Sequence, residues 1–115
     1  MGGMLMPLSA RSHPRYRVQK IASYQYEGKQ FLTLTQDLGL GGMKINTHDY
    51  LPENEHLSFN LVLRESSIRF KGRIAYSNLP PDGEGVSGIQ FTEFPEEDYT
   101  SLQTYLATLE EWRKT

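Results

Sequence analysis

Two short clusters contain the residues best suited to binding chemistry. Arg11 and Arg15 lie four positions apart, and Asp37 begins an Asp-Leu-Gly-Leu-Gly-Gly run that ends at Gly42. A guanidinium offers a planar fork of donors that can pair with phosphate, pair with the O6 and N7 edge of guanine, or stack on the base. The second cluster adds a carboxylate and a glycine-rich backbone that can approach a ligand closely. Together these residue types predict a site for a guanine nucleotide with its phosphates.

The arginine cluster lies near the N-terminus on a segment that is poorly suited to a regular helix. Pro14 disfavours helical backbone in the residue before it, so we expect Arg11 and Arg15 on a semi-extended stretch. Arg17 adds a third guanidinium to this anion-binding region. A mobile stretch loses conformational entropy when a ligand orders it, and a partner protein can detect the change. Residues 11–17 are therefore predicted to act as a ligand-responsive switch segment.

Length, charge and composition exclude several other classes of protein. The chain has 115 residues, which suffice for one domain with one core. A net charge of -2 and a pI of about 5.9 argue against a duplex nucleic-acid binder. The sequence has no cysteine, no membrane-length apolar run and no signal-peptide pattern, and its three histidines lack the spacing of metal ligands. We therefore expect a cytoplasmic protein without a metal site.

Hydrophobic periodicity predicts several strands followed by one helix. Strand patterns occupy six segments: 18–26, 30–36, 43–47, 56–63, 68–76 and 86–91. The stretch 95–114 has helical spacing, with Pro95 expected at the first helical position and acidic residues in the first turn. Short connections indicate a mainly β fold, a six-stranded antiparallel β-barrel with a C-terminal α-helix. We expect residues 1–10 to be a disordered tail and residues 18–94 to form the barrel.

The order of these motifs resembles that of the PilZ domain family. The matching features are Arg-x-x-x-Arg at Arg11 and Arg15, Asp-x-Gly-x-x-Gly at 37–42, and Gly-Ile-Gln-Phe at 88–91. Each motif is weak alone, but their ordered combination spans nearly the whole chain. By this resemblance, residues 11–115 are identified as a single-domain member of the family.

The resemblance implies a function and assigns roles to residues. PilZ domains are bacterial receptors for the second messenger cyclic di-GMP. By resemblance, Arg11 and Arg15 would contact phosphate and guanine, and Asp37 would accept hydrogen bonds from a guanine edge. Gly42 would let the backbone turn beside the ligand. The chain departs from the family at Gly39, where the family has a serine, and losing one neutral hydrogen bond weakens binding by about threefold to tenfold.

The resemblance also bears on partners. A chain of this length has no room for an output domain, so the signal would pass to another protein. The family suggests a part of the flagellar motor, an exopolysaccharide synthase, a pilus assembly factor or a regulator, and hence a role in motility or biofilm formation. Family members include monomers and homodimers, and the sequence does not distinguish these states.

Two other functions stay open from the sequence. The first is a degenerate PilZ domain that binds no nucleotide and acts through protein contacts alone, which Gly39 motivates. The second is a small barrel that binds single-stranded nucleic acid, whose bases stack on exposed aromatic rings, although the acidic balance counts against it. We do not expect an enzyme, because the sequence has no nucleophile–base pair, metal cluster or phosphate-binding P-loop.

Each motif also has a purely structural interpretation. Arg11 and Arg15 could be solvated residues of a tail, and the run 37–42 could be a strand-to-strand turn whose glycines supply positive φ. We expect Gly88 to permit close backbone approach or a bulge rather than to contact ligand. Trp112, near the end of the predicted helix, fits a core position and an exposed partner contact equally well.

Overall fold

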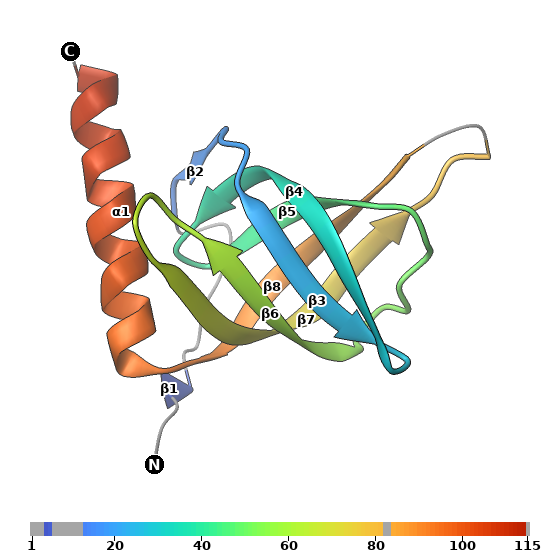
Figure 1. Ribbon diagram of the computed structural model, residues 1–115. Helices are drawn as coiled ribbons and strands as arrows, with labels where there is room; N and C mark the ends of the chain where they lie inside the picture. The colour runs from blue at the N-terminus through green and yellow to red at the C-terminus, as the bar shows by residue number, and fades with distance from the viewer. Residues whose placement is uncertain (1–3, 6–12, 82–83, 115) are drawn as a thin grey trace.

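Six antiparallel strands close into a barrel, and one helix packs across an end of it (Figure 1). This computed structural model describes residues 4–5, 13–81 and 84–114. The barrel strands and the helix are β3 (Ile21–Tyr26), β4 (Lys29–Gly39), β5 (Gly42–Thr47), β6 (His56–Val62), β7 (Ser67–Asn78), β8 (Gly85–Phe94) and α1 (Glu96–Lys114). Strand pairing runs β3–β4–β5–β8–β7–β6 and returns from β6 to β3. The predicted six-stranded antiparallel barrel with a C-terminal helix is confirmed.

Alternation along the strands builds a core that also holds the helix. In β6 every second side chain is buried, Phe59 among them, and the residues between are exposed. Aromatic rings continue from the barrel into α1: Phe70 stacks on Phe94 with centroids 4.7 Å apart, and Phe94 meets Tyr99 edge-on at 5.3 Å. Such ring pairs contribute about 0.5–1.5 kcal/mol each beyond the burial of their area. The helix is therefore anchored by the core of the barrel.

The first turn of α1 differs from the expectation by one residue. Pro95 precedes the helix and its carbonyl accepts a hydrogen bond from the Tyr99 amide at 2.9 Å, so it is the N-cap rather than the first helical residue. Asp98 accepts a hydrogen bond from the Arg69 amide of β7 at 3.0 Å. At the other end of the helix Trp112 is 71% exposed. Of its two predicted positions, in the core or on the surface, the structure shows the surface position. No helix in the described ranges has the length and apolar character needed to cross a membrane.

The hairpin between β3 and β4 forms where the sequence predicts a turn. Glu27 and Gly28 both have positive φ, 52° and 76°, which is the backbone of a two-residue hairpin turn with the twist of the flanking strands. This hairpin fixes the register that pairs Ile21 with Leu34 and Tyr24 with Phe31. The exit of β4 at the far end of the hairpin is thereby positioned beside the N-terminal segment.

Two short strands lie outside the ring. β2 (Arg15–Tyr16) pairs with β4, and β1 (Met4–Leu5) pairs with the end of β8. β1 is the part of the predicted tail 1–10 that the structure describes. The remainder of that tail, together with Arg11, lies outside the described residues, so its expected disorder stays a prediction.

Candidate functional site

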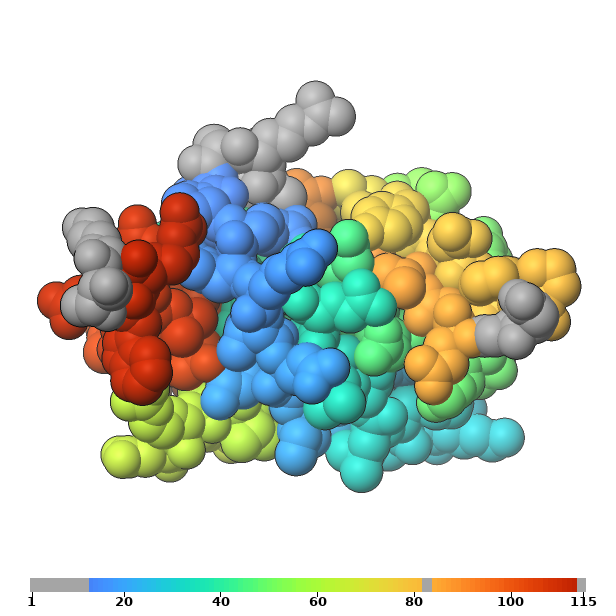
Figure 2. All heavy atoms as spheres, turned by 90° about the horizontal axis from the view of Figure 1, so that it is seen from above, coloured from blue at the N-terminus to red at the C-terminus, as the bar shows by residue number. Residues whose placement is uncertain are grey.

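The arginine segment is laid directly on the barrel by strand pairing. Arg15 pairs with Gly39 and Tyr16 pairs with Leu38 in antiparallel register. Gly39 makes this approach possible, because a Cβ added there would lie only 2.6 Å from the Pro14 carbonyl oxygen. Figure 2 shows the blue N-terminal segment between the red end of α1 and the teal β4–β5 region. The sequence predicts a semi-extended segment; the structure gives its arginine a defined strand partner.

This pairing brings together two of the predicted site residues. The Arg15 guanidinium donates to the Asp37 carboxylate, with Nη1 2.5 Å from Oδ1, across 22 positions of sequence. Their side chains are 31% and 18% exposed, so solvent reaches both partners. An arginine fork and a carboxylate acceptor therefore stand side by side on the surface of the barrel, open to a ligand that presents complementary donors and anions.

Lys44 is a third charged residue of the site, and the sequence analysis missed it. It lies opposite Asp37 in the β4–β5 register, and its Nζ is 3.9 Å from the second carboxylate oxygen of Asp37. Its side chain is 37% exposed. Counting outward from a two-residue turn at 40–41 places Lys44 opposite Asp37, so a correct turn assignment would have found it. The site thus holds two cations around one carboxylate.

The connection in the glycine-rich run is shorter than the interval 37–42 between the two predicted strands. β4 continues to Gly39 and β5 begins at Gly42, so only residues 40–41 connect the two strands. Pairing shifts between Thr35 and Asp37, and this bulge adds one residue to β4 while the strand continues. The expectation that these glycines supply positive φ is wrong, because Gly28 is the one described glycine with positive φ.

Gly42 allows neighbouring groups to approach the backbone closely; it does not serve to turn the chain. A Cβ added there would collide with the carbonyl oxygen of Ile89 on β8 and would lie 3.2 Å from Nη2 of Arg15. At Gly88 the close neighbour is a side chain and not backbone, since a Cβ there would strike the ring of Tyr76. The pairing of β7 with β8 also shifts between Ile74 and Tyr76, which lies opposite Gly88. The floor of the site is therefore bare backbone over which the arginine can lie flat.

The remaining predicted residues lie at the edge of this site. Arg17 is exposed and lines a cavity of about 430 Å³ between the β2 segment and the end of α1. In the wall of this cavity the Tyr16 hydroxyl donates to Glu110 of α1 at 3.1 Å, and the Arg113 guanidinium lies 5.5 Å from the Tyr16 ring centre. Burial raises the pKa of Tyr16, and the hydrogen bond to Glu110 raises it further. The switch segment is thus physically connected to the helix.

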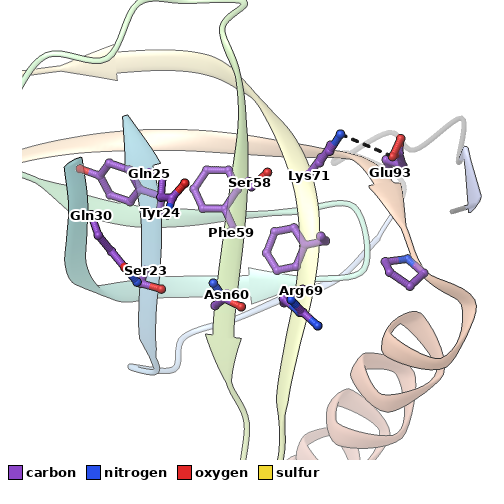
Figure 3. A pocket seen from close by; sticks show the side chains of 12 residues that line it. Ser23, Tyr24, Gln25, Gln30, Ser58, Phe59, Asn60, Arg69, Lys71 and Glu93 are labelled. Carbon is purple, nitrogen blue, oxygen red and sulfur yellow. Dashed lines mark ion pairs between the residues drawn. The ribbon is translucent and has the colours of Figure 1, made fainter. Parts of the chain in front are cut away.

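A larger hollow lies on a different face, over β3, β6 and β7 (Figure 3). It measures about 550 Å³, and its neutral polar lining consists of Ser23, Gln25, Gln30, Ser58 and Asn60. Two cations, Arg69 and Lys71, stand at its rim, and Lys71 lies 4.0 Å from Glu93. None of the predicted site residues lines this hollow. Within the described ranges, no group of three or more histidine, aspartate or glutamate residues is placed to hold a metal ion.

Comparisons with known proteins agree with this architecture. A profile of the PilZ domain matches residues 9–108. Among solved structures, the Bacillus subtilis inhibitor of motility MotI/DgrA has 16% identity and a TM-score of 0.80, and it covers 94% of this chain and 55% of its own. The K. pneumonia MrkH–c-di-GMP complex has 19% identity and a TM-score of 0.72, with 94% and 57% covered. This chain therefore spans little more than half the length of these two proteins.

A third similar structure is the PilZ domain of CeSA from a cellulose-synthesizing bacterium, with 18% identity, a TM-score of 0.62, and 84% and 98% of the chains covered. No curated protein matched the chain. At these identities the structural likeness shows the fold, while the family profile spans most of the sequence. The barrel, the terminal helix and the ordered motifs agree with that profile, and the chain belongs to the PilZ domain family.

Proposed function

We propose that this protein is a non-enzymatic receptor for cyclic di-GMP that binds it at the Arg15–Asp37 site. The single observation that carries the proposal is the direct contact between the arginine fork and the carboxylate on the glycine-floored surface. The family assignment and the similarity to the MrkH–c-di-GMP complex support the choice of ligand. PilZ domains are ligand-binding and adaptor domains, which supports a non-enzymatic role.

In the proposed complex the ligand exchanges partners with the Arg15–Asp37 pair. Asp37 accepts hydrogen bonds from the N1–H and N2–H₂ edge of one guanine, and Arg15 turns to phosphate or to the base. Arg11 and Arg17 supply further positive charge from the switch segment, and Lys44 supplies it from the opposite side of Asp37. An ion pair that water reaches contributes about 0.2–1 kcal/mol, so breaking the Arg15–Asp37 pair makes the free energy of ligand binding only slightly less favourable.

Gly39 is the position where this chain differs from the family pattern, and here its role is to admit β2. Pro14 and Arg15 occupy the space that a side chain at position 39 would need. A receptor with glycine at this position lacks one hydroxyl donor to the ligand. In return, its switch segment pairs directly with β4. We therefore infer a receptor whose ligand must compete with the Arg15–Asp37 contact.

The signal then passes to another protein. We infer an adaptor role in the cytoplasm, with a flagellar, pilus or polysaccharide machine as the class of target, in keeping with the similarity to an inhibitor of motility and to a cellulose-synthase PilZ domain. The ordering of residues 11–17 over the ligand would be the change that the target detects.

A second candidate is a degenerate domain that works through protein contacts alone. Gly39 is the specific observation in its favour, because the family serine is missing and the site is already filled by the chain's own arginine. Under this alternative the Arg15–Asp37 pair is a permanent structural contact. The two candidates differ in one measurable property, which is nucleotide binding by the unmodified chain.

Isothermal titration calorimetry of the full chain with cyclic di-GMP, with GTP as the control, tests the proposal. We expect saturable heat with cyclic di-GMP and none with GTP. The fitted stoichiometry then says whether one ligand or a ligand dimer binds. If cyclic di-GMP produces no heat and the chain is folded by circular dichroism, the receptor function is wrong and the degenerate domain replaces it.

A further inference from the structure

The cavity between the switch segment and the helix contains residues that the proposed site does not use. Its lining consists of Arg15, Tyr16, Arg17, Val18, Leu109, Trp112 and Arg113. The first four follow the N-terminal motif, and the last three lie on the final turns of α1. Figure 2 shows these two segments, blue and red, next to each other on one face of the molecule. The cavity measures about 430 Å³, which is the size class of small-molecule pockets.

The charge of this cavity contrasts with that of the whole chain. Three guanidiniums, those of Arg15, Arg17 and Arg113, line it. The acidic group in its wall is Glu110, which contacts Tyr16 and Arg113, so positive charge is in excess here. The protein as a whole carries a net charge of -2. A local concentration of arginine in an acidic protein favours an anionic ligand at this place, because fields from like charges in a hollow add together.

Aromatic rings give the cavity a second property. Tyr16 and Trp112 both line it, and 71% of the surface of Trp112 is exposed. A large, flat and exposed ring is well suited to stacking with a purine, and arginine planes stack on bases as well. Arginine together with an exposed indole therefore favours a nucleobase joined to phosphate over a simple inorganic anion.

The cavity is continuous with the Asp37 site through one shared residue. Arg15 lines the cavity and also contacts Asp37 at 2.5 Å. A ligand with two purine nucleotides can therefore place one base at Asp37 and direct the other across Arg15 toward the helix. The helix arginine is available for this contact, because its pairing with Glu110 is an exposed contact at 3.6 Å. Such exposed pairs are weak.

We propose that the C-terminal helix is part of the nucleotide site. In this proposal Trp112 stacks on the second purine of the ligand, and Arg113 pairs with its phosphate or base edge. The inference rests on the proposed function and adds to it a specificity surface supplied by α1. Ligand binding then ties the end of the helix to the switch segment, so that both elements are held in one arrangement for a partner to recognise.

Tryptophan fluorescence tests this directly, because Trp112 is the single tryptophan of the chain. The emission of the full chain is followed while cyclic di-GMP is added, and calorimetry gives the affinity of the same sample. Three variants are compared: Trp112→Ala, Trp112→Phe and Arg113→Ala. Tyr50→Ala, which removes an exposed aromatic ring from a distant loop, is the matched control. Thermal unfolding checks that each variant is folded.

We expect saturable quenching of the emission at the concentration where calorimetry shows binding. Trp112→Ala should weaken binding by about fivefold to a hundredfold, since loss of one base–aromatic stack has that effect. Trp112→Phe keeps a stacking ring and should stay within about threefold of the wild type. Arg113→Ala should weaken binding, and the control should match the wild type.

Two results would overturn the inference, and they are distinguishable. If cyclic di-GMP binds by calorimetry but Trp112→Ala and Arg113→Ala keep the wild-type affinity, the helix is not part of the site and the proposed receptor function stands. The same conclusion holds if the emission changes while both affinities stay the same, because the ring then only reports a nearby movement. If the wild-type chain does not bind at all, the receptor function and the role of the helix fail together.

Discussion

Two hollows on this small barrel differ in their volume, in their charged residues and in how much bare backbone they contain. The larger one, over β3, β6 and β7, measures about 550 Å³. Its lining combines hydroxyl and amide side chains with aromatic rings and two cations, of which Lys71 lies close to Glu93. The smaller one, between β2 and α1, measures about 430 Å³, carries three arginines and adjoins the Asp37 carboxylate. The larger volume favours the first hollow as a ligand site. Charge, carboxylate and bare backbone favour the second for a guanine nucleotide with phosphates.

The difference comes from how each face is built. The β3–β6–β7 face is an ordinary outer surface on which polar side chains alternate with core residues. The β2–β4–β5 face has glycines where side chains would obstruct, and there a Cβ at Gly39 or Gly42 would meet backbone of β8 or of the switch segment. A ligand site can therefore be recognised by glycines that leave space for the ligand as well as by the charged side chains that would bind it.

Loss of the Arg15 guanidinium should have the largest effect on cyclic di-GMP binding. Arg15→Ala should lower the affinity for cyclic di-GMP by about a hundredfold or more, because charge-assisted hydrogen bonds are lost and Asp37 keeps only the more distant cation of Lys44. Arg69→Ala, at the rim of the larger hollow, is the matched control and should bind like the wild type. Calorimetry of both variants checks this. Equal affinities in Arg15→Ala and wild type would remove Arg15 from the site.

Replacing Gly39 by the serine that the family has at this position should strengthen binding at the Asp37 site. In Gly39→Ser the new Cβ would lie 2.6 Å from the Pro14 carbonyl oxygen, so β2 must shift away from β4. Release of the Arg15–Asp37 contact and the gain of one hydroxyl donor should both strengthen binding, by about threefold to tenfold. Titration gives the affinity, and faster hydrogen exchange of the amides paired between β2 and β4 reports the loss of strand pairing. Weaker binding in this variant would mean that the β2–β4 pairing persists in the complex.

Lys44 should have a smaller effect, because it acts as an exposed charge. Lys44→Ala should weaken binding by about twofold to fivefold and should reduce its dependence on salt, since one cation near the phosphates is gone. Lys29→Ala, an exposed lysine at the start of β4, is the control. Titrations at two ionic strengths measure both quantities. An unchanged salt dependence would show that Lys44 only positions Asp37.

The contact between Tyr16 and the helix should make the stability of the folded chain depend on pH in the alkaline range. Burial, and then the hydrogen bond to Glu110, raise the pKa of Tyr16 above its ordinary value of 10.0. The folded chain therefore favours the neutral phenol, and this contribution to stability is present below pH 10.0 and is lost as the pH rises through the raised pKa. Chemical unfolding from pH 7 upward should show a shallower alkaline loss in Tyr16→Phe than in wild type.

Tyr50→Phe serves as the control for that comparison, because it removes the hydroxyl of an exposed loop tyrosine. Its alkaline unfolding curve should follow the wild type. Identical curves for Tyr16→Phe and wild type would show that the Glu110 contact does not stabilise the folded chain.

The fold was predictable because its signals are local, whereas the site depends on contacts between distant residues. Strand alternation around Phe59 and the helical stripe after Pro95 can be recognised from a few neighbouring positions. The hydrogen bond from Tyr16 to Glu110 joins residues 94 positions apart, and no periodicity indicates it. Lys44 was missed because the predicted strand ended at residue 36, which left Asp37 without a strand partner. The cavity beside Trp112 exists only once β2 and α1 have packed together.

The most direct test of the central claim is to map the binding face by amide chemical shifts. Labelled full chain is titrated with cyclic di-GMP, and the shifts of all assigned amides are followed. The largest changes should fall on Arg15, Asp37, Gly39 and Lys44, while Ser58, Asn60 and Lys71 stay still. Changes concentrated on the second group would assign the ligand to the larger hollow and contradict the account, and no change on either face would contradict nucleotide binding itself.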